Sequence, residues 1–434
     1  MSDISDYTND IHQGDAADTL AELPESSVHM VMTSPPYFGL RDYGDETNEV
    51  WGGDDDCDHE WTDAGTVKRG GQNTDDNLPD VGGNAHAQDT GIRGDGVSSD
   101  ECRKCGAWRG QLGLEPKLDR FIDNLVNVFR EVRRVLRPDG SAWLNLGDSY
   151  AQDDADEFGR KNKMLVPHRV AIALQDDGWI VRNDVTWVKP NPMPSSVKDR
   201  LNTTTEQVFH LVPEPDYWYD LDAIREPHTE RSIERMSEGP VNADTDGRGT
   251  NDDLNPDQLC DPAGKNPGDV FEVTTKPFPE AHFAVYPPEL VETPLKATCP
   301  SKVCAACGSP YERDVNVLSG SDSNIDGDVS ADGVPRHTAG LDEKTAEEKR
   351  YRAEHKGWNP TCDCDTDATE AGIALDPFAG AGTTALVAKR HGRRFVGIDL
   401  NEEYVAMAQK RLGLTVDNPE HVRDDADAGL EDFA

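Results

Sequence analysis

The feature that most constrains the fold of this chain is a glycine-containing turn at residues 376–384, DPFAGAGTT. An apolar run at 373–375 precedes the turn and an amphipathic segment at 383–391 follows it, which predicts a strand, a tight turn and a helix. Gly380 and Gly382 allow the backbone to turn sharply and to approach a ligand without a clashing Cβ atom. A unit of this kind is typical of an open α/β sheet.

The ligand expected at this turn is nucleoside-like. A second strand is predicted at 394–398 and ends at Asp399, about 20 residues beyond the turn. An acid at that place commonly holds the ribose hydroxyls of a bound nucleotide. The turn lacks the Lys-Ser/Thr ending of a phosphate-binding loop, which disfavours a triphosphate. S-adenosylmethionine is the leading candidate.

A second motif, Thr-Ser-Pro-Pro-Tyr at 33–37, follows a buried strand expected at 28–33. Its two prolines lack N–H donors, so the motif offers carbonyl acceptors, the Ser34 hydroxyl and the aromatic ring of Tyr37. Acceptors suit an exocyclic amino group, and the ring suits a base turned out of its stack. Taken alone, the motif is equally consistent with a proline-rich turn beside a core tyrosine.

The remaining ordered segments also alternate between helical and extended patterns. The clearest helix is expected at 117–137, where apolar residues recur every three or four positions until Pro138-Asp139-Gly140 ends the pattern. Three segments rich in Gly, Asp and polar residues, 63–100, 228–268 and 317–358, are expected to be surface insertions or arms. Further helices are expected at 16–23, 164–176 and 402–412, and further strands at 9–14, 141–146, 179–188 and 205–212.

Acidic residues dominate the composition. The 84 Asp and Glu residues outnumber the 43 Lys and Arg residues, giving a net charge of −41. Such an excess fits a protein adapted to high salt, where counterions screen the repulsion. The alternative is a disordered acidic protein, which the periodic apolar segments argue against.

The sequence also indicates the cellular compartment and the state of the cysteines. The chain has no apolar run long enough to span a membrane and no signal peptide at its polar start, so a cytoplasmic protein without a membrane partner is expected. Its nine cysteines are then expected to be reduced, and clustered cysteines indicate metal sites before disulfides.

Eight potential metal ligands form two sets of four, each split by one of the loose segments. Two paired ligands on either side of a flexible span suit tetrahedral zinc, and filled sets of four predict two structural sites. Unpaired core thiols are the alternative. The first set is Cys57, His59, Cys102 and Cys105, and the second is Cys304, Cys307, Cys362 and Cys364.

Together, the 33–37 and 376–384 motifs resemble those of the DNA amino-methyltransferases that act on cytosine N4 or adenine N6. The Ser-Pro-Pro-Tyr form resembles the cytosine-N4 branch, because the adenine branch more often has Asp at the position of Ser34. The order of the two motifs resembles the permuted beta class, and the acidic composition suggests a halophilic archaeon. Gly14-Asp15 and the stretches 187–200 and 282–290 also match the pattern.

The resemblance implies a Rossmann-like α/β fold that is circularly permuted, with a seven-stranded sheet and helices on both faces, and the two sets of Cys and His ligands predict zinc-bound insertions in it. Residues 9–212 would form the catalytic half, with a zinc-pinned insertion at about 51–110, and 372–412 the cofactor half of the same sheet. Residues 213–371 would form a target-recognition or insert region, and 413–434 an acidic tail. The implied cofactor-binding residues are Asp15, Phe283, Pro287, Asp376, Phe378, Gly380, Gly382, Thr383 and Asp399.

The resemblance also implies a mechanism of direct methyl transfer. The hydroxyl of Ser34 and the carbonyl of Pro35 would accept the two N–H bonds of the target amine, and Tyr37 would stack on the flipped base. Positioning and electrostatics would then supply much of the rate. Trp187 is expected in the core rather than in the stack. The implied catalytic residues are Ser34, Pro35, Pro36 and Tyr37.

Double-stranded DNA is the implied substrate. Because the chain as a whole is acidic, DNA must be bound by local clusters of Lys and Arg residues. The helix at 117–137 carries six Lys and Arg residues, but a solvated polar face is the preferred interpretation. Lys189 and Asn191 are expected either to meet DNA or to support their loop. Other candidates near the expected cleft are Lys161, Lys163, Lys198 and Arg200.

Three alternatives remain open at this stage. The first is adenine-N6 methylation by the same fold, and the second is a non-catalytic, zinc-stabilised DNA-binding regulator. The third, methylation of a protein amide, is disfavoured because that branch usually has Asn at the position of Ser34. A cognate restriction endonuclease is a possible partner, and the recognition sequence cannot be read from the chain.

Overall fold

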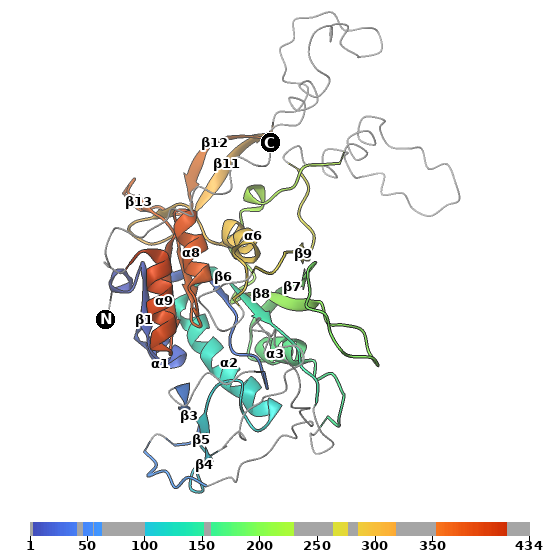
Figure 1. Ribbon diagram of the computed structural model, residues 1–434. Coiled ribbons are helices and arrows are strands. Elements are labelled where there is room, and N and C mark those ends of the chain that lie inside the picture. The colour runs from blue at the N-terminus through green and yellow to red at the C-terminus, as the bar shows by residue number, and fades with distance from the viewer. Residues whose placement is uncertain are drawn as a thin grey trace, which may run out of the picture.

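The computed structural model describes residues 3–40, 47–54, 56–62, 100–151, 158–229, 264–276, 285–317 and 353–414 (Figure 1). The main helices are α1 (Ala16–Glu22), α2 (Leu118–Val135), α3 (Val166–Asp176), α6 (Pro288–Thr298), α8 (Thr383–Arg390) and α9 (Glu402–Leu412), with short 3₁₀ turns at Ile4–Asp6 and Leu221–Ala223.

A mixed eight-stranded sheet forms the centre of the molecule, in the order β1-β15-β14-β2-β6-β8-β7-β9. The first five strands of that order are parallel to their neighbours, and β8 runs antiparallel to both β6 and β7. The strands are β1 (Asp10–Gln13), β2 (Val28–Thr33), β6 (Leu136–Leu146), β7 (Ile180–Val188), β8 (Thr205–Val212), β9 (Val270–Glu272), β14 (Ile373–Asp376) and β15 (Arg394–Asp399).

Strands from the two ends of the chain are therefore interleaved. The late strands β14 and β15 lie between the early strands β1 and β2. The expectation of seven strands is wrong by one, because the three-residue β9 pairs with β7 at one edge of the sheet. A strand this short has no alternating pattern that a sequence analysis could detect.

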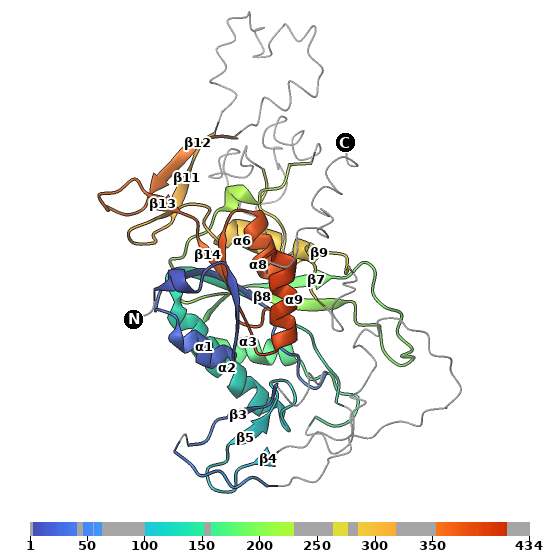
Figure 2. The same cartoon turned by 60° about the vertical axis from the view of Figure 1, so that its left-hand side comes forward.

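Helices cover both faces of the sheet (Figure 2). One core cluster joins α1, α2 and α3 to side chains such as Val31 and Leu144, and a second joins α6, α8 and α9 to Met32 and Trp143. Ten residues of α2 are buried, which explains why its apolar periodicity is so clear in the sequence. The layered α/β class predicted from the sequence is confirmed.

Most predicted elements lie within two residues of the observed ones, and β2, β8 and α9 match fully. One boundary is wrong: Pro138-Asp139-Gly140 does not separate α2 from the next strand. Strand β6 begins at Leu136, directly after the helix, and the extra residues form an irregularity where its pairing with β2 shifts register. Helix α6 was not predicted, because Pro294 lies inside it and interrupts its pattern.

Three small sheets lie outside the central one, β3-β5-β4, β10-β13 and β11-β12. The first lies at one end of the molecule and the β11–β12 hairpin at the opposite end in both views (Figures 1 and 2). The loose segments and the acidic tail fall largely outside the described residues, but the end of the third segment was wrongly expected to be aperiodic, because residues 353–358 belong to strand β12 and pair with β11. No helix among the described residues is long and apolar enough to cross a membrane. The strands are β3 (Glu49–Trp51), β4 (Asp100–Glu101), β5 (Trp108–Gly110), β10 (Val303–Cys304), β11 (Tyr311–Val317), β12 (Ala353–Pro360) and β13 (Thr369–Glu370).

Candidate active site

The two motifs singled out in the sequence meet at the carboxyl ends of two neighbouring strands in the middle of the central sheet. Strands β2 and β14 are parallel neighbours, so the turn that follows each one emerges at the same edge. The Thr33 hydroxyl donates a hydrogen bond of 2.7 Å to Asp376 Oδ1 and joins the last residues of the two strands. We call residues 33–37 the catalytic turn and 376–384 the cofactor turn, after the roles expected of them from the sequence.

Asp376 is the junction of the two turns. Its Oδ1 also accepts the Phe378 amide at 3.1 Å, and its Oδ2 accepts the Tyr286 hydroxyl at 2.7 Å. The side chain is only 1% exposed, and this burial raises its pKa above the usual value. Tyr286 also lies 2.6 Å from the Thr384 hydroxyl, which donates to the Met32 carbonyl. Tyr286 lies in the matched stretch 282–290 but was not singled out by the sequence analysis.

Asp399, at the end of β15, supports the cofactor turn from the other side. Its carboxylate accepts the Gly380 amide at 2.7 Å and the Asn401 amide at 3.0 Å. Burial, together with the nearby charge of Asp376, raises the pKa of Asp399 to about 6 despite these two bonds. The carboxyl is therefore poised to gain or lose a proton near neutral pH.

The backbone of the cofactor turn requires its glycines. Gly380 and Gly382 have φ values of +50° and +71°, and a Cβ on Gly382 would lie 3.0 Å from the Ala408 Cβ. Helix α8 begins at Thr383 without a side-chain cap, so its first amides point toward the turn. Thr383 itself is buried, and its hydroxyl accepts a hydrogen bond from Arg411.

The other predicted cofactor residues have separate surroundings. Asp15 caps α1 by accepting the amides of Ala17 and Asp18, and it directly follows Gly14, whose amide bonds to the Asp399 carbonyl. Burial raises the pKa of Asp15. Pro287 is buried at the start of α6, Phe378 packs against the core on the α1–α3 face, and Phe283 lies outside the described residues.

The catalytic turn is held by a side-chain network rather than by glycines. The Ser34 hydroxyl donates to the Tyr37 hydroxyl at 3.1 Å, and Tyr37 donates to Glu206 Oε2 at 2.8 Å. Asn145, from β6, donates to the Tyr37 hydroxyl at 2.7 Å and lies 3.3 Å from Ser34 Oγ and 3.1 Å from Glu206 Oε2. Glu206, from β8, is paired with Lys189, which follows β7.

Sequence analysis did not identify Asn145 or Glu206. Burial alone would raise the pKa of Glu206, but the Lys189 ammonium and the hydrogen bonds from Lys189, Tyr37 and Asn145 outweigh it and lower that pKa. Lys189 therefore has a supporting role in the site through Glu206. Asn191 likewise supports its own loop, since its side chain bonds to Thr275.

Packing orients the Tyr37 ring. A Cβ on Gly147 would lie 2.6 Å from the ring, so the ring rests on that backbone, and a Cβ on Gly113 would lie 3.0 Å from the Tyr37 carbonyl. Glu115 fixes the Gly113 amide at 2.8 Å, and burial raises the pKa of Glu115 to about 7. Trp187 is 3% exposed and donates to a backbone carbonyl, which confirms it as a core residue.

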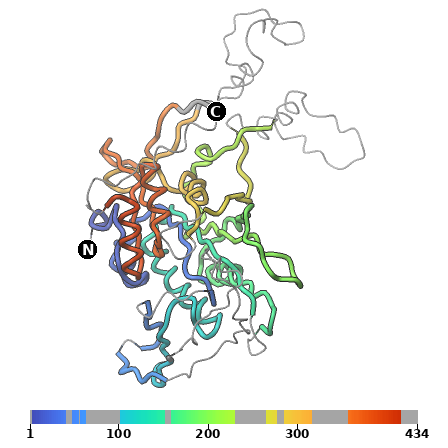
Figure 3. The backbone as a smooth tube through the Cα atoms, viewed as in Figure 1, coloured from blue at the N-terminus to red at the C-terminus, as the bar shows by residue number. Residues whose placement is uncertain are grey.

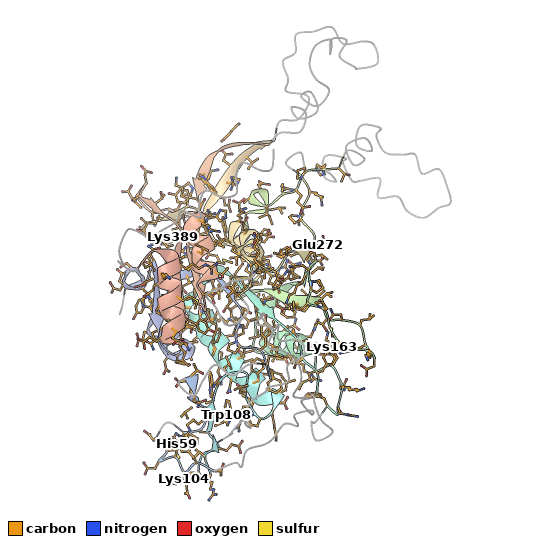
Figure 4. All side chains as sticks on the ribbon, viewed as in Figure 1. His59, Lys104, Trp108, Lys163, Glu272 and Lys389 are labelled. Carbon is orange, nitrogen blue, oxygen red and sulfur yellow. The ribbon has the colours of Figure 1, made fainter. Side chains whose placement is uncertain are left out.

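The two predicted sets of metal ligands are each brought together. In each set, the four sulfur or nitrogen atoms all lie within 4.8 Å of one another. The first set is carried by the small β3-β5-β4 region, where His59 is labelled at one end of the molecule (Figure 4). The second is tied to the central sheet, because buried His29 bonds to the Gly308 carbonyl and Arg137 bonds to the Cys307 carbonyl. Thiolates and an imidazole in such clusters are the donors that zinc prefers.

The arginines of α2 are used within the protein. Arg130 pairs with Asp177, and Arg133 donates to the carbonyls of Asp177 and Pro213. Arg120 forms an ion pair with Glu101. Arg134 forms an ion pair with Glu131 and also donates to two backbone carbonyls. This helix therefore offers little free positive charge to a DNA backbone.

Comparison with known proteins agrees with these observations. The family described as DNA methylase (N6_N4_Mtase) matches residues 28–303 and 367–410. Type II methyltransferase M.SfiI of Streptomyces fimbriatus is 32% identical over 91% of this chain and 89% of its own length. Type II methyltransferase M.XycI of Xanthomonas campestris pv. cyanopsidis is 28% identical over 93% and 87%. The solved PvuII DNA methyltransferase (cytosine-N4-specific) is 15% identical, with a TM-score of 0.46 and coverage of 94% and 86%, too distant to carry an inference.

Proposed function

This chain belongs to the DNA methylase family, and on that premise we propose that it transfers the methyl group of S-adenosylmethionine to the exocyclic N4 of cytosine in double-stranded DNA. The observation that carries the proposal is the meeting of the two turns at one sheet edge, joined by the Thr33–Asp376 hydrogen bond. One turn presents acceptors suited to an amine, and the other has the backbone and carboxylate suited to a nucleoside.

The cofactor turn fits S-adenosylmethionine by its chemistry. The uncapped start of α8 offers amides, and Asp399 offers a carboxylate for ribose hydroxyls. When bound, the cofactor supplies an electrophilic methyl group. We assign the surrounding wall to Phe378, Pro287 and Phe283, and the adenine end to Asp15, with Asp376, Gly380, Gly382 and Thr383 shaping the turn.

The catalytic turn would bind and orient the target amine. Ser34 Oγ and the Pro35 carbonyl accept its two N–H bonds and favour a tetrahedral nitrogen whose lone pair faces the methyl group. Pro36 adds no competing N–H donor, and Tyr37 stacks on the flipped base. The methylated nitrogen carries a positive charge and loses its proton readily, so the site requires no strong base.

Cytosine is proposed over adenine because Ser, rather than Asp, stands at position 34. The test is mass spectrometry of nucleosides from DNA incubated with the enzyme and cofactor in high salt. N4-methylcytosine is expected, and N6-methyladenine would support the alternative base. Absence of both, from protein shown to be folded, would instead favour the non-catalytic DNA-binding regulator.

The chain is proposed to divide as its resemblance implies, with residues 9–212 and 372–412 as two halves of one permuted unit and 213–371 as the target-recognition region. DNA would approach along the loop between β7 and β8, which extends from the body (Figure 3). Leu201 on this loop is 89% exposed, and Lys198 is exposed nearby. A cognate restriction endonuclease remains a proposed partner.

Two structural zinc ions are also proposed, one in each set of four ligands. Cys and His donors gathered within 4.8 Å support the assignment. Elemental analysis of native protein should find about two zinc ions per chain, and chelation should lower the unfolding temperature. A folded protein that contains no zinc would contradict the proposal.

A further inference from the structure

Glu206 is a buried carboxylate beside the catalytic turn to which the proposed reaction assigns no role. Its side chain is 15% exposed, and that of its partner Lys189 is 12% exposed. Burying such a pair is costly unless further hydrogen bonds satisfy both groups. Glu206 obtains these bonds from Tyr37 and Asn145, which both also contact Ser34.

Ser34 can receive a target amine only if its own hydroxyl proton points elsewhere. A hydroxyl has one donor and two acceptor lone pairs, and an amine N–H needs one of the lone pairs. The Tyr37 hydroxyl accepts the Ser34 proton at 3.1 Å. Tyr37 can do so because its own proton is committed to Glu206 at 2.8 Å.

An ionised Glu206 fixes this direction because a carboxylate can only accept. Tyr37 therefore donates to Glu206, and Ser34 donates to Tyr37. Asn145 Nδ2 has two hydrogens for three acceptors, Tyr37 Oη at 2.7 Å, Glu206 Oε2 at 3.1 Å and Ser34 Oγ at 3.3 Å. With the shortest of these bonds made, both Tyr37 lone pairs are used and Ser34 keeps at least one lone pair. That remaining lone pair is the one an incoming N–H would meet.

We propose that Glu206 is a positioning residue that sets the direction of the Ser34–Tyr37–Glu206 hydrogen-bond chain and thereby makes Ser34 an acceptor for the target amine. The inference rests on the proposed methyl transfer to an exocyclic amine and holds for either base. Lys189 takes part by keeping Glu206 ionised, since its ammonium pairs with that carboxylate rather than with Ser34.

The test combines Glu206→Gln and Tyr37→Phe with the double variant. A glutamine brings an N–H donor that can reverse the chain, whereas Tyr37→Phe removes the middle link but keeps the ring. Single-turnover methyl transfer at saturating cofactor and DNA should fall about 10²-fold in each single variant. The dissociation constant of S-adenosylmethionine, measured by calorimetry, should not change.

The double variant distinguishes positioning from a structural role. If Glu206 acts through Tyr37, the double variant should be no more than about 3-fold slower than either single variant, because the second change cuts a chain already broken. Independent structural effects would instead multiply. Glu292→Gln is the matched control, since Glu292 forms an exposed ion pair with Lys296 on α6, and it should methylate at the wild-type rate.

The outcomes separate this inference from the proposed function. An active wild-type enzyme with an unimpaired Glu206→Gln variant, or with multiplying effects, would overturn the inference alone. If Glu206→Gln fails to fold because Lys189 loses its partner, the Tyr37→Phe variant tests the inference instead. A wild-type rate of methyl transfer in Tyr37→Phe would overturn the proposed hydrogen-bond chain. A folded wild-type protein that methylates no DNA overturns both.

Discussion

The catalytic turn and the cofactor turn lie side by side, yet they are built in opposite ways. The cofactor turn depends on backbone conformation, with positive φ at Gly380 and Gly382 and a carboxylate bonded to a backbone amide. The catalytic turn depends on side chains, with Ser34 and Tyr37 held by groups from β6 and β8. One turn is thus shaped mainly by its own sequence and the other by its tertiary surroundings.

The sequence separation of the partners explains what each turn reveals before folding. Gly380 and Asp399 are 19 residues apart, whereas Tyr37 is 108 residues from Asn145 and 169 from Glu206. A short separation leaves a recognisable motif, but a long one leaves two polar residues with no visible relation. The difference suggests that substitutions in the cofactor turn act locally, while those around the catalytic turn act through a network.

The largest effect is expected where the two turns are joined. Asp376→Ala removes the acceptor of Thr33, Tyr286 and the Phe378 amide together and leaves buried donors without partners. Each such donor costs about 1–3 kcal/mol, so the free energy of unfolding should fall by about 3 kcal/mol or more. Both cofactor binding and methyl transfer should be lost.

Chemical denaturation in high salt measures this effect. Asp3→Ala provides the control, because Asp3 caps an exposed 3₁₀ turn at the start of the chain and should change stability little. An Asp376→Ala protein that kept either function at the wild-type level would show that the two turns are not coupled through this residue.

The second effect is confined to the catalytic turn. Ser34→Ala removes one positioned acceptor while Asp399 and the cofactor turn stay intact, so turnover should fall by about 2–4 kcal/mol in barrier while S-adenosylmethionine still binds. Tyr37→Ala removes the hydroxyl that accepts the Ser34 proton, so it should also slow the transfer step, and loss of the ring should in addition weaken capture of the flipped base by about 1–3 kcal/mol. Rapid-quench kinetics separates the two losses. Wild-type turnover in Ser34→Ala, or a covalent adduct between Ser34 and DNA, would refute direct transfer with Ser34 as acceptor.

The third effect is confined to the cofactor turn. Gly382→Val places a branched side chain at φ +71°, with Ala408 in the way, and should weaken cofactor binding by about 10-fold or more. Gly392→Val is the matched control. Gly392 has a φ of +66°, but an added Cβ would meet no atom within 4 Å, and the residue lies away from the turn. Calorimetry on both variants tests this, and equal losses would mean that backbone strain, not the cofactor turn, sets the affinity.

How much could be predicted therefore depended on distance along the chain. The α/β class, most element boundaries and both turns followed from local patterns, and both sets of potential metal ligands followed from the close spacing within each Cys or Cys/His pair. Glu206 and Asn145 could not be found, because neither stands out among the polar residues of its strand and its partner is set by strand pairing. Strand β9 was missed because three residues are too few to show an alternating pattern, and α6 was missed because Pro294 interrupts its helical pattern. The same limit applies to α2, where a solvated polar face was expected but Arg130 and Arg133 contact Asp177, a residue that only the folded structure brings near.

The smallest effect is a pH dependence of cofactor binding, which we expect from the cofactor turn. A carboxylate that accepts ribose hydroxyls must be ionised, and the pKa of Asp399 in the free protein is raised to about 6 by burial. S-adenosylmethionine affinity should therefore be constant above pH 7 and fall by about 10-fold per unit below pH 6.

Folding stability should move in the opposite direction over the same window. Because the folded pKa of Asp399 lies above the ordinary value of 3.8, the folded state binds a proton at a pH where the unfolded chain does not. The contribution of Asp399 to stability thus grows as pH falls through about 6, while cofactor affinity declines. Asp399→Asn should bind the cofactor more weakly at pH 8 and lose both dependences. A variant that kept the wild-type pH profile of binding would assign the titration to another group, such as Asp15 or Asp376, and would remove the ribose contact from Asp399.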